Sequence, residues 1–202
     1  MTRLRRLRRS PALYVCDEFA SAEECEALRA GANDPALPSR LDTISRHDHT
    51  GFSFEWPIDL HPLLGTLSRR IDAIVGVSNE MGLTFRFRRY AVGEAHPPHV
   101  DCYDAGDLRL VITALLGLST PDGGGATVFP RALPAVEVPA LAGRLVVWCN
   151  YYPNGAPDPT AYHEGAAVTG GEKVTLTSFI YKPEAFCGYR PAVAAADEAR
   201  PG

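Results

Sequence analysis

Several features that define large protein classes are missing from this 202-residue chain. No apolar run reaches the roughly 18 residues that a membrane-spanning helix requires. The five cysteines are widely spaced and contain no CxxC pair, which argues against a disulfide framework and a thiolate zinc site and is typical of a reducing cytoplasm. The formal net charge of −4 disfavours a nucleic-acid-binding surface. We therefore expect a cytoplasmic protein that binds neither membrane nor nucleic acid, and the oligomeric state stays open.

The two ends of the chain differ in composition from its middle. Five arginines occur among the first nine residues, but no apolar segment of roughly 7–15 residues follows them, as a secretory signal would require. We expect residues 1–11 to form a solvated, partly disordered arm and residues 191–202 a flexible tail. Residues 12–190 are long enough to form a single domain with its own core.

The hydrophobic pattern changes near residue 84. Before it, ALYVCDEFA predicts a short strand, and two segments predict helices: one begins after the capping box of Ser21 and Glu24 and ends near Gly31, and the other runs from His61 to about Val75 with one apolar face. After it, the alternation of TFRFRRYAV and the β-branched runs predict six short strands. This order favours a β-sandwich or barrel carried on N-terminal helices. The expected strands are TFRFRRYAV, LRLVITALLGL, ATVF, AVEV, RLVVWCN and KVTLTSFIY.

A metal site is suggested by His99 and Asp101, because residues i and i+2 of a strand point to the same face. His163 precedes a strand in the second half of the β region and could supply the third ligand. Two histidines and one carboxylate on one side of a metal leave about three positions open, as in non-haem Fe(II) oxygenases. The other histidines have simpler interpretations: a solvated loop for His47 and His49, a helix cap for His61, and a local structural role for His96.

Lys173 opens the apolar strand VTLTSFIY, where an unpaired ammonium group would be costly to bury. A dicarboxylate that chelates the metal at one end would present its other carboxylate to this lysine. A solvent-facing lysine in the GGEK turn is the alternative that the residues alone leave open.

Three motifs follow one another along the chain. They are Tyr90-x-x-Gly93-Glu94-x-x-x-x-His99-x-Asp101, then Gly124-Gly125-x-Thr127-x-Phe129-Pro130, then His163-x-x-x-x-Val168-x-x-Gly171-Glu172-Lys173. In this order they resemble the motifs of the prolyl 4-hydroxylase branch of the Fe(II)/2-oxoglutarate dioxygenases. The resemblance covers roughly residues 12–184.

The resemblance implies a mainly β fold with flanking helices, a double-stranded β-helix (a jelly-roll, cupin-like barrel). It implies that His99, Asp101 and His163 bind Fe(II), that Lys173 pairs with the distal carboxylate of 2-oxoglutarate, and that Tyr90 and Thr127 hydrogen-bond to the same co-substrate. It also places Phe179 near the co-substrate. The implied activity is hydroxylation of an unactivated C–H bond with O₂, releasing succinate and CO₂, with ascorbate as a supporting reductant.

The implied substrate is an amino-acid-derived, peptidyl or natural-product molecule. Departures from the family pattern at Ala126, Ala167, Val174 and residues 116–118 weaken a specific assignment to peptidyl proline. The alternative function is a non-catalytic metal-binding or sensing barrel, perhaps holding Zn²⁺ through the same three ligands. Lys173 discriminates between the two, because such a barrel has no need of a lysine facing the pocket.

Overall fold

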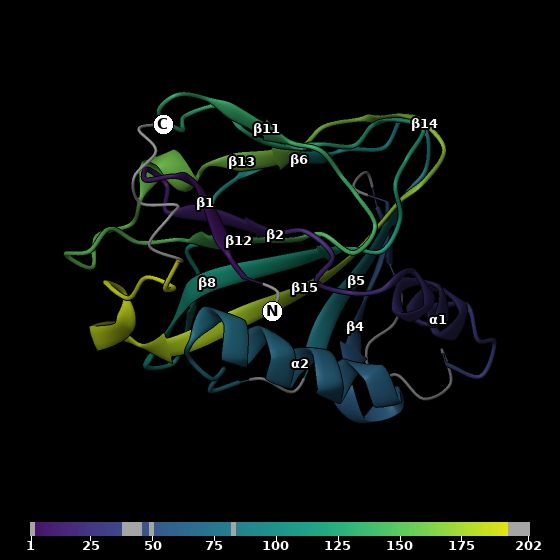
Figure 1. Ribbon diagram of the computed structural model, residues 1–202, viewed down its shortest axis with the longest axis horizontal. Coiled ribbons are helices and arrows are strands. Elements are labelled where there is room, and N and C mark those ends of the chain that lie inside the picture. The colour runs from purple at the N-terminus through teal and green to yellow at the C-terminus, as the bar shows by residue number, and fades with distance from the viewer. Residues whose placement is uncertain (1–2, 38–45, 49–50, 82–83, 194–202) are drawn as a thin grey trace.

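The computed structural model describes residues 3–37, 46–48, 51–81 and 84–193. These residues form antiparallel sheets with two α-helices packed on one side (Figure 1). The fold is therefore mainly β with flanking helices, as the sequence predicts. In the described part of the chain, no helix is long and apolar enough to cross a membrane.

The largest sheet runs through the middle of the molecule, and a smaller sheet faces it (Figure 1). All strand pairings in both sheets are antiparallel, as expected for a jelly roll. The major sheet has the order β1 (Arg5–Arg8), β2 (Leu13–Cys16), β12 (Leu145–Cys149), β8 (Leu108–Gly117), β15 (Lys173–Pro183), β5 (Thr84–Tyr90), β4 (Gly51–Pro57) and β3 (Arg46–Asp48), with β7 (Asp104–Ala105) also paired to β8. The minor sheet has the order β11 (Val136–Val138), β10 (Thr127–Phe129), β13 (His163–Gly165) and β6 (His96–His99), and a separate ribbon pairs β14 (Val168–Gly170) with β9 (Gly123–Gly124).

The two α-helices begin and end close to where the sequence places them. Helix α1 (Ala22–Ala32) starts at the predicted capping box: Glu24 N donates to Ser21 Oγ, and Ser21 N donates to the Glu24 carboxylate. Helix α2 (Pro62–Val75) is capped by His61, whose Nδ1 accepts a hydrogen bond from Leu63 N at 3.3 Å. Gly76 ends it in the left-handed conformation that glycine adopts at low cost. The described residues also contain three single turns of 3-10 helix, η2 (Ile58–Leu60), η3 (Pro159–Ala161) and η4 (Glu184–Phe186).

Strand alternation divides the interior into two cores. In β12, Val147 faces the helices while Val146 and Trp148 face the minor sheet. The larger core joins the major sheet to the apolar face of α2, including Leu67 and Ile71. The smaller core fills one end of the space between the two sheets, and the other end of that space stays open as a cavity.

Four strands of the major sheet, β1, β3, β4 and β7, lie outside the predicted set. Residues 5–8, which we expected within a solvated arm, form β1, because their backbone pairs with β2 and Leu4 inserts into the larger core. Strand β4 pairs with β5 over six residue pairs and was not among the predicted strands. His47 lies in the short strand β3, and His49 lies outside the described residues, as does the tail beyond residue 193.

Candidate active site

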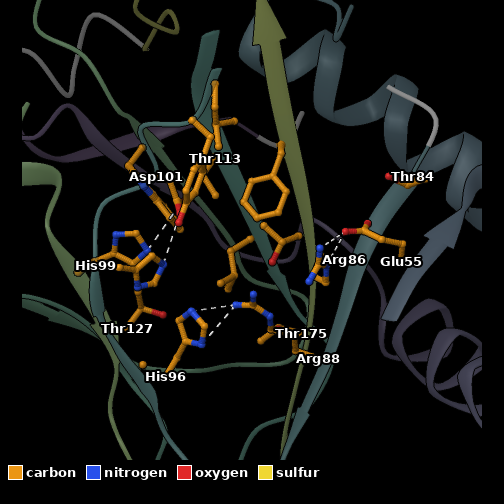
Figure 2. Close-up of a pocket in the computed structure, with 18 of the residues that line it drawn as sticks. Glu55, Thr84, Arg86, Arg88, His96, His99, Asp101, Thr113, Thr127 and Thr175 are labelled. Atoms are coloured by element: carbon orange, nitrogen blue, oxygen red, sulfur yellow. Dashed lines mark hydrogen bonds and ion pairs between the residues drawn. The ribbon is translucent and has the colours of Figure 1, made fainter. Parts of the chain in front are cut away.

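The three predicted ligands meet at one end of the minor sheet. His99 ends β6 and His163 begins β13, and the antiparallel register places the two residues directly opposite each other. Asp101 lies two residues beyond the end of β6. One ligand atom from each residue falls within 4.8 Å of the other two, so a single ion could contact all three. Figure 2 shows the side chains of His99 and Asp101 turned toward each other.

Both imidazoles are held with the same nitrogen facing Asp101. His99 Nδ1 lies 2.8 Å from the carbonyl oxygen of Pro97, and His163 Nδ1 lies 2.9 Å from that of Ala161. A carbonyl accepts only, so each Nδ1 carries a proton, and each Nε2 is the ring nitrogen turned toward Asp101 and available as a metal ligand once deprotonated. The two Nε2 atoms lie 3.4 and 3.7 Å from the carboxylate oxygens of Asp101.

The carboxylate of Asp101 is fixed by strands of the major sheet. Its Oδ2 accepts a hydrogen bond of 2.9 Å from Thr113 Oγ1 of β8, and that hydroxyl accepts one of 3.1 Å from Asn150 Nδ2. Burial alone would raise the pKa of Asp101, but the hydrogen bond with His99 and the nearby His163 and Thr113 lower it below its usual range. The group is therefore anionic at neutral pH, the form that binds a cation.

Burial determines the protonation of His163, which packs against Phe129 and Trp148. It lowers the pKa of this imidazole to about 4. His163 is consequently neutral near pH 7, as a metal ligand must be.

A cavity of about 640 Å³ opens from this cluster and lies between the two sheets. Lys173, Tyr90, Thr127 and Phe179 all line it, so every predicted co-substrate residue faces the same space as the three ligands. Lys173 begins β15 opposite Tyr90 of β5, and its Nζ lies 5.4 Å from the centre of the tyrosine ring.

Lys173 is buried rather than solvent-facing, with 4% of its surface exposed. Within the described residues, no carboxylate forms an ion pair with it. Burial, and secondarily the charge of Arg88, lower its pKa to about 8. The cavity thus presents a buried ammonium group without an acidic partner, so the solvent-facing lysine that the sequence left open as an alternative is wrong.

Four residues of the site have roles that the sequence analysis did not identify. Arg88 faces the cavity from β5, and His96, which we expected to be only structural, contacts it from β6 with 3.1 Å between Arg88 Nη1 and His96 Nε2. Thr113 and Asn150 support Asp101. The alternation of TFRFRRY already placed Arg88 on the face opposite Phe87, but no sequence signal connected Thr113 with Asp101.

The residues present fit a metal and a dicarboxylate. Two imidazoles and one carboxylate form the donor set of a non-haem Fe(II) centre, and the side chains leave the cavity side of the cluster open. The buried amine of Lys173 would supply the complementary charge for an anion bound in the cavity.

Comparison with known proteins agrees with this geometry. Residues 85–181 match the family described as the 2OG-Fe(II) oxygenase superfamily. Prolyl 4-hydroxylase 13 of Arabidopsis thaliana is 24% identical over 201 residues, covering 85% of this chain and 71% of that protein. Prolyl 4-hydroxylase 1 of the same plant is 26% identical over 195 residues, covering 85% and 69%. The chain is a 2OG-Fe(II) oxygenase of the prolyl 4-hydroxylase-like branch.

The fold of this oxygenase is shared with solved structures. The viral collagen prolyl hydroxylase of Paramecium Bursaria Chlorella virus-1, in complex with 2OG, superposes with a TM-score of 0.68 at 19% identity, covering 87% of this chain and 98% of that one. The predicted jelly roll is therefore confirmed. As a 2OG-dependent dioxygenase, the protein uses Fe(II), 2-oxoglutarate and O₂.

Proposed function

We propose that His99, Asp101 and His163 are the protein ligands of the Fe(II), and that Lys173 binds the distal carboxylate of 2-oxoglutarate. The observation that carries the proposal is the buried, unpaired Lys173 in the same cavity as the three ligands. Tyr90 and Thr127 hydrogen-bond to the co-substrate beside it. A non-catalytic barrel would gain nothing from burying an uncompensated ammonium group there.

When bound, the Fe(II) centre with 2-oxoglutarate and O₂ supplies oxidative decarboxylation to succinate and CO₂ together with hydroxylation of a C–H bond. The protein's own residues orient the reactants and exclude water. Thr113 holds the Asp101 carboxylate, and the carbonyls of Pro97 and Ala161 hold the two imidazoles. Ascorbate serves as a supporting reductant.

The substrate is a small amino-acid-derived, peptidyl or natural-product molecule. The cavity of about 640 Å³ is large enough for 2-oxoglutarate and part of a second reactant. The relatives are named prolyl 4-hydroxylases, but the departures at Ala126, Ala167 and Val174 favour a broader range of substrates. We further propose a single catalytic domain over residues 12–190, a cytoplasmic location that suits five free cysteines, and no nucleic-acid partner.

The test of the metal site is anaerobic addition of Fe(II) and 2-oxoglutarate. We expect a weak visible charge-transfer band in the wild-type protein that disappears in His163→Ala. His61→Asn is the control, because asparagine also caps a helix and His61 lies outside the cavity. A wild-type protein with full metal occupancy and no band would contradict the proposal.

The test of the co-substrate site is 2-oxoglutarate affinity, measured by calorimetry with an inert divalent metal. Lys173→Ala should weaken binding by roughly 3–5 kcal/mol, as expected when one partner of a buried charge pair is lost. Lys182→Ala is the matched control, because Lys182 is a buried lysine of the same strand that pairs with Glu80 instead. Equal affinity in the Lys173 variant and the wild type would reject the assignment.

A further inference from the structure

Arg88 lies on the cavity wall between the co-substrate residues and the outer part of the cavity. Strand β5 points Arg86, Arg88 and Tyr90 into the cavity, and in the register with β15 these residues lie opposite Thr177, Thr175 and Lys173. Arg88 is therefore one two-residue step, about 7 Å, along the strand from the Tyr90–Lys173 pair.

Arg88 differs from its neighbours on β5 in having no acidic partner. Arg86 pairs with Glu55, and Arg89, on the opposite face, pairs with Glu172. Within the described residues, the polar contacts of Arg88 are to the ring of His96, and its Nε is buried without a hydrogen-bond partner (Figure 2). A guanidinium group only donates, so His96 Nε2 accepts and holds Nη1 in place. The remaining N–H donors of the Arg88 guanidinium group can bind a ligand.

The formal charges of the cavity lead to the same conclusion. Its charged lining residues are Glu55, Arg86, Arg88, Asp101 and Lys173. Glu55 and Arg86 cancel, and Asp101 offsets half of the charge of a divalent metal. A 2-oxoglutarate dianion then offsets the rest of the metal charge and that of Lys173. The charge of Arg88 is the one that remains.

We propose that Arg88 binds a carboxylate of the molecule that is oxidised, so that the substrate of this enzyme is a carboxylic acid. Arginine suits this role, because its planar fork matches a carboxylate with two parallel hydrogen bonds. His96 is a positioning residue that orients the guanidinium group. The inference rests on the proposed function, since it assigns Lys173 to 2-oxoglutarate and leaves Arg88 for the second reactant.

The experiment uses the protein loaded with Ni(II), an inert substitute for Fe(II), and with saturating 2-oxoglutarate. Binding of 3-phenylpropanoate and of its amide, 3-phenylpropanamide, is measured by ligand-observed NMR. We expect the wild-type protein to prefer the carboxylate by about tenfold or more, and Arg88→Gln to abolish that preference. Arg86→Gln, which removes the same charge from the same cavity, should change carboxylate binding by less than about threefold. Arg88→Lys, which keeps the charge but not the fork, should lie between the wild type and Arg88→Gln.

Calorimetry of 2-oxoglutarate in the same proteins separates the two sources of carboxylate. Arg88→Gln should retain 2-oxoglutarate affinity within about threefold, whereas Lys173→Ala should not. Loss of 2-oxoglutarate binding in Arg88→Gln would assign Arg88 to the co-substrate and overturn the inference. Equal binding of acid and amide by the wild type, or equal effects of the Arg86 and Arg88 substitutions, would overturn it as well. A wild-type protein that fails to bind 2-oxoglutarate would instead reject the proposed function.

Discussion

The two faces of strand β15 differ sharply in chemical character. Val174, Leu176 and Ile180 point toward the helices and belong to the larger core. Lys173 and Thr177 point the other way and line the cavity. One face removes apolar surface from water, and the other buries polar groups whose partners are ligands.

This difference separates folding from chemistry within a single strand. The apolar face needs nothing beyond the chain to be stable, because its contacts are complete in the fold. The polar face is incomplete without its reactants, since Lys173, and Arg88 on the neighbouring strand β5, lack acidic partners among the described residues. Substitutions on the apolar face should therefore lower the stability of the protein. Substitution of Lys173 on the polar face should stabilise the ligand-free protein and weaken ligand binding.

The largest expected effect on stability is on the apolar face. Leu176→Ala should lower the free energy of unfolding by roughly 2–5 kcal/mol, because Leu176 is fully buried and the substitution leaves a hole. Its neighbour Thr177 faces the cavity, and Thr177→Ala should cost about 1 kcal/mol or less. Denaturant unfolding of both variants measures the difference. Equal costs would mean that the two faces of β15 are not distinct.

Lys173→Met should stabilise the ligand-free protein. Burial lowers the pKa of Lys173 from 10.5 to about 8, which corresponds to roughly 3 kcal/mol against the folded state at neutral pH. Between about pH 8 and 10.5 the unfolded chain binds more protons at this group than the folded chain, so its destabilising effect is complete below pH 8 and is lost as the pH rises through that window.

Unfolding measured at pH 7 and pH 10 compares the wild type with Lys173→Met. The stability difference should be largest at pH 7 and should shrink at pH 10. Saturating 2-oxoglutarate and metal should reverse its sign at pH 7, because only the wild type gains the ion pair. A difference that does not depend on pH would show that the ammonium group is well solvated.

A smaller effect, on metal affinity, is expected when Thr113, which holds the Asp101 carboxylate, is substituted. Thr113→Val removes the hydroxyl that donates to Asp101 Oδ2 and should weaken metal affinity by roughly 10–100-fold, the usual cost of losing an outer hydrogen bond to a ligand. Thr177→Val is the matched control, a threonine of the cavity wall without contact to the ligands. Metal titration with a competing chelator compares them, and identical affinities would remove Thr113 from the site.

The smallest effect belongs to a charge that is already paired at the surface. Arg70 of α2 lies 2.7 Å from Glu24 of α1, and both side chains are partly exposed. Arg70→Gln should change the free energy of unfolding by about 1 kcal/mol or less, since solvent screens such pairs. Thermal unfolding at low and high salt measures it. A loss as large as that of Leu176→Ala would contradict the contrast between paired surface charges and the buried core.

Local patterns in the sequence predicted the elements whose signals are local. The apolar spacing of α2 and the alternation of β5 follow from the periods of helix and strand. Strand β1 was missed because its arginines read as solvent-exposed, and its stability comes from pairing with β2 and from Leu4. Strand β4 carries an alternation of Phe52, Phe54 and Trp56 that could have predicted it.

The residues of the candidate site likewise fall into those that a local sequence pattern predicts and those that it does not. The ligands and Lys173 lie in motifs with fixed spacing, so their residue types could be recognised without coordinates. The contact between Thr113 and Asp101 depends on how β8 crosses the end of β6, which no local pattern contains. That Arg88 lacks an acidic partner is a property of the whole set of neighbours, and only the three-dimensional structure reveals it.

A crystal structure with Fe(II) and 2-oxoglutarate, with anomalous scattering measured at the iron edge, tests the central claim most directly. We expect one iron peak bonded to Nε2 of His99, Nε2 of His163 and a carboxylate oxygen of Asp101, with the far carboxylate of 2-oxoglutarate at Lys173 Nζ. Iron bound elsewhere, or 2-oxoglutarate with that carboxylate away from Lys173, would contradict it.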